Sequence, residues 1–238
     1  MTAPTEADQQ PPATWYELCM DTTGGERLGR FWAEVVGARF EPDAEDGNVV
    51  SDLPGGGVAM CRVPEAKSVK HRVHLDIYTT SVGSLRDLGA SVVLPAKESG
   101  LGWTVMADPE GGEFCAFLRE PDALPDYRLH GVVVDCADPE AQARWWGAAF
   151  GVEVKGDAEK GWWWLEEVPG MPITTMDFVP VPEPKTVKNR IHWDVRSTVE
   201  EMRTLGARLL RARDEEISWD VMADPEGNEF CVFDRLPS

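Results

Sequence analysis

The chain has 238 residues, of which 42% are hydrophobic, and its formal net charge is −19. This length and composition suffice to bury a core in one large domain or in two of ordinary size. The negative charge excludes a nucleic-acid backbone or an anionic membrane as the expected partner, because both would repel the chain. The expected partner is therefore a small-molecule ligand.

The chain begins with a polar, acidic, proline-containing segment at residues 1–14. This segment lacks the basic and apolar regions of a signal peptide, so we expect a disordered tail. No apolar run approaches the roughly 20 residues needed to span a bilayer. The five cysteines are odd in number, and four of them lie in apolar, strand-like runs. This pattern favours buried, reduced thiols in a cytoplasmic protein over a disulfide framework.

After the tail, the pattern predicts a strand at 16–21, an amphipathic helix at 25–37 and a further strand at 56–63. A second round follows, with a strand at 72–78, a short helix at 81–89 and strands at 90–96, 103–108 and 113–118. The turn before the last strand reads DPEGG, with proline and glycine at positions that favour a tight turn. Each round is a βαβββ module.

The whole pattern is then repeated. WTVMADPEGGEFCAF at 103–117 returns as WDVMADPEGNEFCVF at 219–233, with 12 of 15 positions identical. KSVKHRVHLD at 67–76 returns as KTVKNRIHWD at 185–194. The spacing makes the repeat a whole domain rather than a short solenoid unit. We therefore expect one domain at 15–118, a linker at 119–127 and a second domain at 128–236.

Alternation along the strands predicts a binding cup. In the strand at 72–78, Val73, Leu75 and Ile77 are apolar, whereas His74 and Asp76 point to the opposite face. The strands at 16–21 and 113–118 alternate in the same way. Polar and ionisable side chains should therefore gather on one face of a curved sheet.

The strings KNRIHWDV and MADPEGNEFCVF, about thirty residues apart, resemble the glyoxalase, bleomycin-resistance and extradiol-dioxygenase superfamily, also called the vicinal oxygen chelate superfamily. The chain looks similar to tandem glyoxalase-like domain proteins of actinobacteria. The resemblance implies an α+β fold of four βαβββ modules paired into two cup-shaped sheets, related by a pseudo-two-fold axis. The chain would be a pseudo-dimeric monomer or a homodimer. Because the superfamily includes isomerases, epimerases, dioxygenases, transferases and metal-free drug binders, it does not fix the reaction.

In metal-using members of this superfamily, the ligands come from the first and last strands of each module. Carried over to the first domain, these positions are Glu17, Cys61, His74 and Glu113. In the second domain they are Gly131, Val179, His192 and Glu229, with His130 one residue out of register and facing the wrong way. Glu17, His74 and Glu113 would suit Zn, Ni, Mn or Fe, with Glu17 and Glu113 as catalytic groups. The alternative is that each His–Glu pair only orders the floor of a cup.

Other residues admit two interpretations. Asp76 and Asp194 could orient the neighbouring imidazoles, but pairing with Arg72 and Arg190 is favoured. The Lys67, Lys70 and Arg72 cluster and its repeat could hold an anion, although a solvated loop is favoured. Trp163, in a run of three tryptophans, either stacks on a ligand or packs in the core, and Trp103 and Trp219 are further candidates for ligand contact. Cys115 and Cys231 are expected to be core thiols, because nothing nearby would lower their pKa.

Two classes of function follow. The first is a lyase, isomerase or dioxygenase that uses a divalent metal in the first domain's cup to act on a small oxygenated metabolite. The second is a metal-free protein that sequesters a cationic or aromatic small molecule or drug. The incomplete set of metal ligands in the second domain favours the metal-free binding protein, whereas Glu17 in the first strand favours the metal-dependent enzyme.

Overall fold

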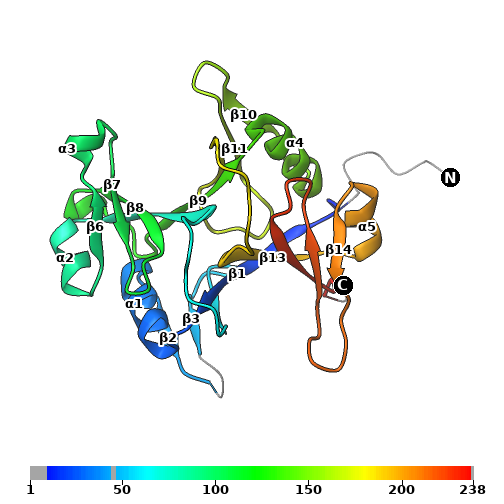
Figure 1. The fold of residues 1–238 in the computed structure, drawn as a ribbon, viewed down its shortest axis with the longest axis horizontal. Coiled ribbons are helices and arrows are strands. Elements are labelled where there is room, and N and C mark those ends of the chain that lie inside the picture. Colours follow the sequence, from blue (N-terminus) through cyan, green and yellow to red (C-terminus); the bar gives the residue numbers. More distant parts are fainter. Residues whose placement is uncertain (1–9, 44–46, 237–238) are drawn as a thin grey trace.

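The structure is a computed structural model, and it describes residues 10–43 and 47–236. Its strands form two eight-stranded sheets, sheet A and sheet B (Figure 1). In order across sheet A, the strands are β14 (Arg208–Arg211), β15 (Asp220–Ala223), β16 (Glu229–Phe233), β13 (Ile191–Arg196), β1 (Thr14–Thr22), β4 (Val58–Arg62), β3 (Asn48–Val50) and β2 (Arg39–Glu41). Across sheet B they are β10 (Val154–Asp157), β11 (Trp162–Glu166), β12 (Thr175–Pro180), β9 (Leu129–Cys136), β5 (Val73–Thr79), β8 (Glu113–Leu118), β7 (Thr104–Ala107) and β6 (Ser91–Leu94).

The helices lie between and beside these strands. They are α1 (Glu26–Val36), α2 (Val82–Asp87), α3 (Ala96–Ser99), α4 (Pro139–Phe150) and α5 (Val199–Thr204), with a 3₁₀ turn at Pro121–Ala123 in the expected linker. The two sheets and their helices confirm the predicted α+β architecture of four βαβββ modules in two cups. The short strands β2 and β3 were not predicted, because three residues are too few to show a clear alternation.

Each sheet takes one module from each repeat, which corrects the expectation that each repeat builds its own cup. At the centre of sheet A, β1 pairs antiparallel with β13 of the second repeat, with Cys19 opposite His192. At the centre of sheet B, β5 pairs antiparallel with β9 in the same manner. β5 and β13 share the same alternation, with His and Asp at matching positions, so either could pair with β1. The connection at residues 63–72 carries the chain away from sheet A before β5 begins.

The two long helices join the sheets into one hydrophobic core. On α1, the ring of Trp32 lies 5.2 Å from that of Phe114 in sheet B, and the same helix packs against β2 and β3 of sheet A. On α4, the ring of Trp146 lies 4.9 Å from that of Trp193 in sheet A, while the helix also packs against β11 and β12 of sheet B. Because each helix contacts both sheets, neither sheet has a core of its own.

The ends of α4 show why the sequence forms a helix there. Pro139 occupies the first helical position, where its missing N–H costs no hydrogen bond. The side chain of Asp138 caps the helix by accepting a hydrogen bond from the backbone N–H of Ala141 at 3.0 Å. Gly151 ends the helix with φ 67°, a left-handed conformation that glycine adopts without strain.

Strand alternation is confirmed in the central strands. Val73, Leu75 and Ile77 are buried in the shared core, as are Leu18 and Met20 of β1. The opposite faces of β1, β5, β13 and β16 carry polar and thiol side chains away from the helices. This alternation places the ionisable residues of these strands on the two cup floors.

Part of the expected tail is ordered. Residues 1–9 lie outside the described part of the chain, but residues 10–13 contact the second repeat. Ala13 is fully buried, and its backbone N–H donates to the carbonyl of Ala149 at 2.8 Å. The carbonyl of Pro12 accepts from the Ser197 hydroxyl at 2.6 Å. These hydrogen bonds hold the entry to β1 against α4 and the end of β13.

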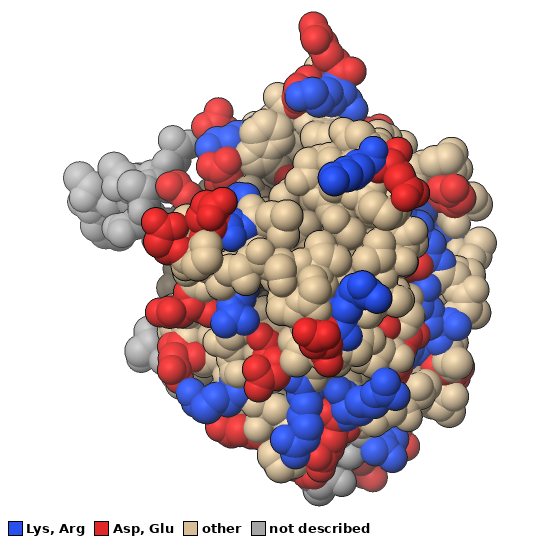
Figure 2. All heavy atoms as spheres, turned by 90° about the vertical axis from the view of Figure 1, so that its left-hand side faces the viewer, with Lys and Arg blue, Asp and Glu red and all other residues tan. Residues whose placement is uncertain are grey.

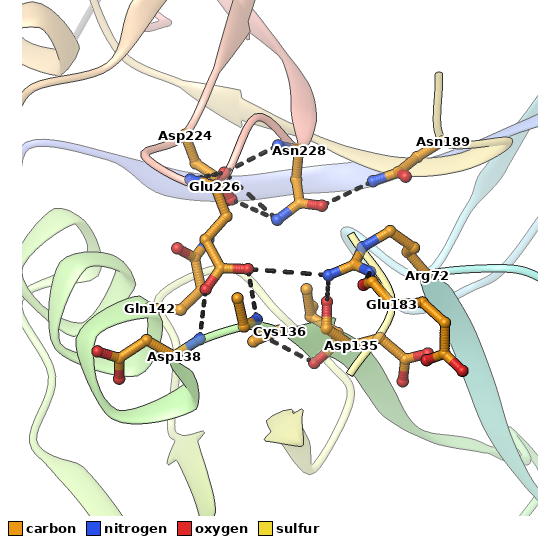
Figure 3. Close-up of polar contacts among 12 residues, drawn as sticks. Arg72, Asp135, Cys136, Asp138, Gln142, Glu183, Asn189, Asp224, Glu226 and Asn228 are labelled. Atoms are coloured by element: carbon orange, nitrogen blue, oxygen red, sulfur yellow. Dashed lines mark hydrogen bonds and ion pairs between the residues drawn. The ribbon is translucent and has the colours of Figure 1, made fainter. Parts of the chain in front are cut away.

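The two DPEG turns connect the repeats, and Figure 3 shows the contacts of the second turn, through Glu226. Both oxygens of Glu226 accept backbone N–H groups at the start of α4, from Ala137 at 2.9 Å and Asp138 at 2.7 Å. Arg72 of the first repeat lies 3.9 Å from the same carboxylate. In the equivalent place, Arg190 donates to Glu110 at 3.1 Å. The glutamate of the turn therefore accepts hydrogen bonds at the start of a helix and also pairs with an arginine of the other repeat.

Figure 2 shows the end of the molecule that carries β6, where an area without Lys, Arg, Asp or Glu lies among scattered acidic and basic groups. On β6, Val92, Val93 and Leu94 are exposed. Within the described residues, no helix combines the length and apolar character required to cross a membrane.

Candidate functional site

The floor of sheet A carries a cluster of metal-ligand side chains, here called cluster A: Cys19, Cys61, His192, Asp194 and Cys231. Cys19 Sγ lies 3.5 Å from Asp194 Oδ2, and Cys231 Sγ lies 3.5 Å from His192 Nε2. The ligand atoms of Cys19, His192 and Asp194 all lie within 4.8 Å of one another. Cluster A therefore converges from β1, β4, β13 and β16, which come from both repeats.

Strand register explains this convergence. Cys19 is opposite His192 across the β1–β13 pair, and Asp194 is beside Cys231 across the parallel β13–β16 pair. Cys61 lies on β4, one strand beyond β1, beside Asp21. Neighbouring strands lie about 4.8 Å apart, so side chains on the same face can meet.

The floor of sheet B carries a smaller set, here called cluster B: His74, Asp76, Cys115 and Asp177. His74 Nε2 lies 3.9 Å from Asp76 Oδ1, and the ligand atoms of His74, Asp76 and Cys115 lie within 4.8 Å of one another. In sheet B, Val133 lies opposite His74. The equivalent position in sheet A is taken by Cys19, which lies opposite His192. Cluster B thus has one thiol, Cys115, where cluster A has three.

Both clusters contain buried polar atoms that no described residue satisfies. Asp194 Oδ1, His192 Nδ1 and Asp76 Oδ1 have no hydrogen-bond partner. Burial raises the pKa of Asp194 to about 7 and that of Asp76 to about 8. Burial also lowers the pKa of His192 to about 3 and that of His74 to about 4. A bound cation would supply the positive charge that stabilises the ionised form of these buried carboxyl groups.

The donors of cluster A fit a divalent metal ion. Thiolate, imidazole and carboxylate groups are the ligands of zinc sites, and thiolates select against hard ions such as magnesium. Three thiols, one imidazole and one carboxyl group exceed the four ligands that a zinc ion needs. Cluster B offers two carboxyl groups, one imidazole and one thiol, a harder set.

The metal site expected from the sequence is not assembled. Glu17 lies in sheet A, opposite Asp194, whereas His74 and Glu113 lie in sheet B. Cys61 is also in sheet A. The expectation treated residues of one repeat as neighbours, but the sheets exchange modules between repeats. The structure instead brings Glu17 and Cys61 into the same sheet as His192.

Glu113 and Glu229 do not point toward the clusters as free ligands. Glu113 pairs with Lys67 at 2.8 Å and accepts the backbone N–H of His71 at 3.0 Å. Glu229 pairs with Lys185 at 2.8 Å and accepts the backbone N–H of Asn189 at 3.1 Å. Each glutamate thus uses one oxygen for a lysine and the other for the loop before β5 or β13.

The preference for Asp–Arg pairs on these strands is wrong. The preference for solvated lysine loops agrees with Lys70 and Lys188, whose side chains are 59% and 52% exposed, but not with Lys67 and Lys185. Arg72 donates to the carbonyls of Asp135 and Glu183, and neither Asp76 nor Asp194 has an arginine partner. Lys67 and Lys185 are only 15% and 13% exposed. Lys67 and Lys185 pair with glutamates of their own repeats, whereas Lys70 and Lys188 pair with Asp135 and Asp21 of the opposite repeat.

The three tryptophans expected to contact a ligand lie in different environments. Trp103 stacks on Phe117 at 5.1 Å in the cup of sheet B, and Trp219 stacks on Phe233 at 5.5 Å in that of sheet A. Trp163 instead packs on the helix side, where the Arg144 guanidinium of α4 lies 5.8 Å from its ring. Its neighbour Trp162, on the opposite face of β11, lies 6.5 Å from Trp103.

His130 faces the cup, contrary to the expectation. The β5–β9 register shifts between Asp76 and Ile77, so β9 has one extra residue at His130. The imidazole stacks on Tyr78 at 4.0 Å and lies edge-on to Phe117 at 4.9 Å. The extra residue of a β-bulge reverses the face of the strand to which a side chain points, and nothing in the local sequence predicts this bulge.

A buried imidazole outside both clusters makes stability depend on pH. Burial lowers the pKa of His71 to about 4, whereas an unfolded histidine titrates near about 6.5. The unfolded chain therefore binds more protons in this window, and the free energy of unfolding falls as the pH drops through it.

For this residue alone, the loss between about pH 7 and about pH 5 is about 2 kcal/mol. We predict that His71→Asn loses correspondingly less stability than the wild type over that range. Urea unfolding of both proteins at the two pH values measures the difference. Equal losses would show that His71 titrates normally in the folded protein.

A family model described as a glyoxalase-like domain matches residues 17–117 and 131–233. Comparison with curated proteins gives no significant match. Glyoxalase I from Zea mays has a similar structure, with 15% identity, a TM-score of 0.64 and coverage of 93% of this chain and 92% of that one. A Bacillus subtilis protein with a provisional description as a dioxygenase has 12% identity, a TM-score of 0.62 and coverage of 97% and 87%.

Proposed function

Because this chain belongs to the glyoxalase-like domain family and contains the domain twice, we propose that it acts on a small oxygenated metabolite with the help of a divalent metal ion held by cluster A. The single observation that carries this proposal is the convergence of Cys19, His192 and Asp194 on the floor of sheet A. Asp194 Oδ1 is buried without a hydrogen-bond partner among the described residues, which supports a role in binding a cation rather than in packing.

Cys19, His192, Asp194 and Cys231 would hold the ion, with Cys61 at the edge of the set. When bound, such an ion supplies a Lewis acid for a carbonyl or hydroxyl oxygen. The residue best placed to move a proton is Glu17, which is opposite Asp194 in the β1–β13 pair. Burial raises the pKa of Glu17, which brings this carboxyl group closer to the working range of a general acid or base.

An aromatic wall beside cluster A would orient the substrate. Phe233 contacts both Tyr16 at 5.1 Å and Trp219 at 5.5 Å. The Arg196 guanidinium lies 4.0 Å from the centre of the Tyr16 ring. These rings would contact the apolar part of a metabolite while its oxygen atoms face the cluster. Glu113 lies in the other sheet and has no part in this site.

We predict that the protein binds Zn²⁺ through cluster A and that His192→Ala weakens this binding at least about 100-fold, because ligand loss costs more than the loss of an outer hydrogen bond. His74→Ala is the matched control, since His74 holds the equivalent position in sheet B and should leave the tight site intact. Isothermal titration of both variants with Zn²⁺, Ni²⁺, Mn²⁺ and Fe²⁺ measures the effect.

Binding to the folded state alone also raises stability, by about 2.7 kcal/mol at a free ion concentration 100 times the dissociation constant. A chelator should therefore lower the melting temperature of the metal-loaded wild type but not that of His192→Ala. If His74→Ala lost tight metal binding and His192→Ala retained it, the metal site would lie in sheet B instead.

A second candidate is metal-free binding of an aromatic or cationic molecule in the cup of sheet B. The observation that favours it is the group of rings formed by Tyr78, Trp103, Phe117, His130 and Trp162, of which Trp162 is 40% exposed. Aromatic faces attract both rings and cations. Failure of all four metals to bind would leave this candidate as the better one.

A further inference from the structure

The edge strands of the two sheets differ in charge. They are β14 and β2 in sheet A, and β10 and β6 in sheet B. An edge strand presents unpaired backbone N–H and C=O groups, and charged side chains on it keep the edges of two molecules from pairing. Lys, Arg, Asp or Glu occurs in β14, β2 and β10, whereas β6 reads SVVL and contains none of them. Among the strands that the structure describes, β6 is thus the sheet edge without this protection.

The absence of charge is specific to the first repeat. β6 and β14 each follow an LGA segment, so Ser91 and Leu94 of β6 take the places of Arg208 and Arg211 of β14. Arg211 also forms ion pairs with the loop that follows it, at 2.7 and 2.6 Å. Both strands have an irregular register at the equivalent residue. The two edges therefore have similar backbones, and their side chains make the difference.

The other two edges carry ion pairs. Arg39 of β2 pairs with Asp52 at 2.8 Å, and Lys155 of β10 pairs with Glu166 at 2.5 Å. If a second molecule approached either edge, these charged groups would lose water, and that loss is costly unless new partners replace it. Edge-to-edge contact is therefore least costly at β6.

The side chains of β6 and its chain neighbours are exposed and apolar. Val92, Val93 and Leu94 are all more than a third exposed, with Val93 the most at 55%, and so are Leu88 before the strand and Leu101 after it. The area without charged side chains in Figure 2 lies at the end of the molecule that carries this strand. Covering these side chains would remove apolar surface from water. We call β6 together with Leu88 and Leu101 the β6 edge.

We propose that the β6 edge binds a second copy of this chain, with the two β6 strands antiparallel and side by side across a two-fold axis. An antiparallel pair of identical strands is self-complementary, because each copy offers the other the same donors, acceptors and apolar side chains. The B sheets of the two copies then join edge to edge. This interface lies outside both clusters and does not depend on the proposed metal function.

Charge favours a second copy as the occupant and limits the assembly to a dimer. Two chains with a formal net charge of −19 repel each other, so they approach most easily where neither carries charged side chains. Pairing uses β6 of both copies, and the opposite edge of each B sheet is β10, which contains Lys155 and Asp157. No second uncharged edge remains among the described strands, so the two-fold contact closes the assembly.

The dimer should be weak and reversible, because one short strand and its neighbours cover less than a standard interface of about 1,600 Å². Sedimentation of the full chain should give a mass of 26.3 kDa at about 1 µM and approach twice that mass toward about 500 µM. Raising the NaCl concentration from about 0.05 M to about 0.5 M should strengthen association, because salt screens the repulsion between the acidic chains. A single species of 26.3 kDa at about 500 µM in the higher salt would overturn the proposal.

Hydrogen exchange of the full chain locates the contact surface. The amides of residues 91–94 should exchange more slowly at the higher protein concentration, because pairing gives the outward N–H groups of β6 acceptors. The amides of β2, β10 and β14 should exchange at the same rates at both concentrations. A dimer that leaves β6 unprotected would overturn the assignment of the interface.

Val93→Lys should weaken association at least about tenfold, because it brings two like charges together across the two-fold axis. Leu210→Lys is the matched control, since Leu210 is the equivalent residue of β14 and is also exposed, and it should leave association unchanged. Both side chains are exposed, so circular dichroism of the two variants should match that of the wild type. If the two lysines weakened association equally, β6 would not be the contact surface.

Discussion

Residues 10–120 expressed alone should form a dimer, and the monomer of this fragment should be largely unfolded. In the full chain, β1 pairs with β13 and β5 pairs with β9. The fragment retains β1 and β5 but loses both partners, so each of its half-sheets would expose an unpaired edge. The interface of α1 with β8 would also lose the support of the second repeat.

A second copy of the fragment can supply what is missing. β13 repeats the sequence of β5, and β9 occupies the place of β1 in its repeat. Two fragments can therefore pair β1 of one copy with β5 of the other, twice, and rebuild two eight-stranded sheets with two-fold symmetry. The expected dimer is thus a symmetric version of the full chain.

Analytical ultracentrifugation across a range of concentrations, together with circular dichroism, tests this expectation. Secondary structure should be lost as the fragment is diluted and dissociates, because folding and association are coupled. Co-expression with residues 121–238 should give a one-to-one complex of the two halves as the matched control. A stable, folded monomer of residues 10–120 would contradict the exchange of modules between repeats.

Trp146→Ala should cause the largest loss of stability of any single substitution considered, about 3 to 5 kcal/mol. Trp146 is fully buried, and its ring lies within 5.2 Å of those of Trp145, Phe150, Trp193 and Phe230. Its indole N–H also donates to Asp224 at 3.2 Å. The substitution would leave a cavity between α4 and sheet A and remove one of the donors to a buried carboxylate.

Guanidinium unfolding of the wild type and the variant measures this loss. Trp146→Phe should lose less, because it keeps most of the ring contacts. Trp219→Ala is a control on the cup side, where the tryptophan is half-buried and stacks on Phe233, so its loss should be clearly smaller. If Trp146→Ala and Trp219→Ala were equally costly, α4 would not be the element that joins the two sheets.

The sequence by itself determined the modules and the faces of their strands. Alternation of Val73, Leu75 and Ile77 with His74 and Asp76 is local, and a strand that has one face in the core must obey it. The duplicated DPEG turns and the preceding KxVKxR loops likewise fixed the number and order of the modules. These features depend only on residues close together in the chain, so they could be predicted together with the family resemblance.

Only the tertiary structure decided which residues share a cup. β5 and β13 share the same alternation, with His and Asp at matching positions. Pairing within a repeat and pairing between repeats therefore satisfy the same local pattern, and the alternation could not choose between them. That choice separates Glu17 from His74 and joins Cys19 to His192. The bulge at His130 and the lysine pairs of Glu113 and Glu229 also depend on partners from distant parts of the chain. Convergence of side chains is a property of long-range strand pairing, and the energy that selects this pairing comes from the core shared by both repeats.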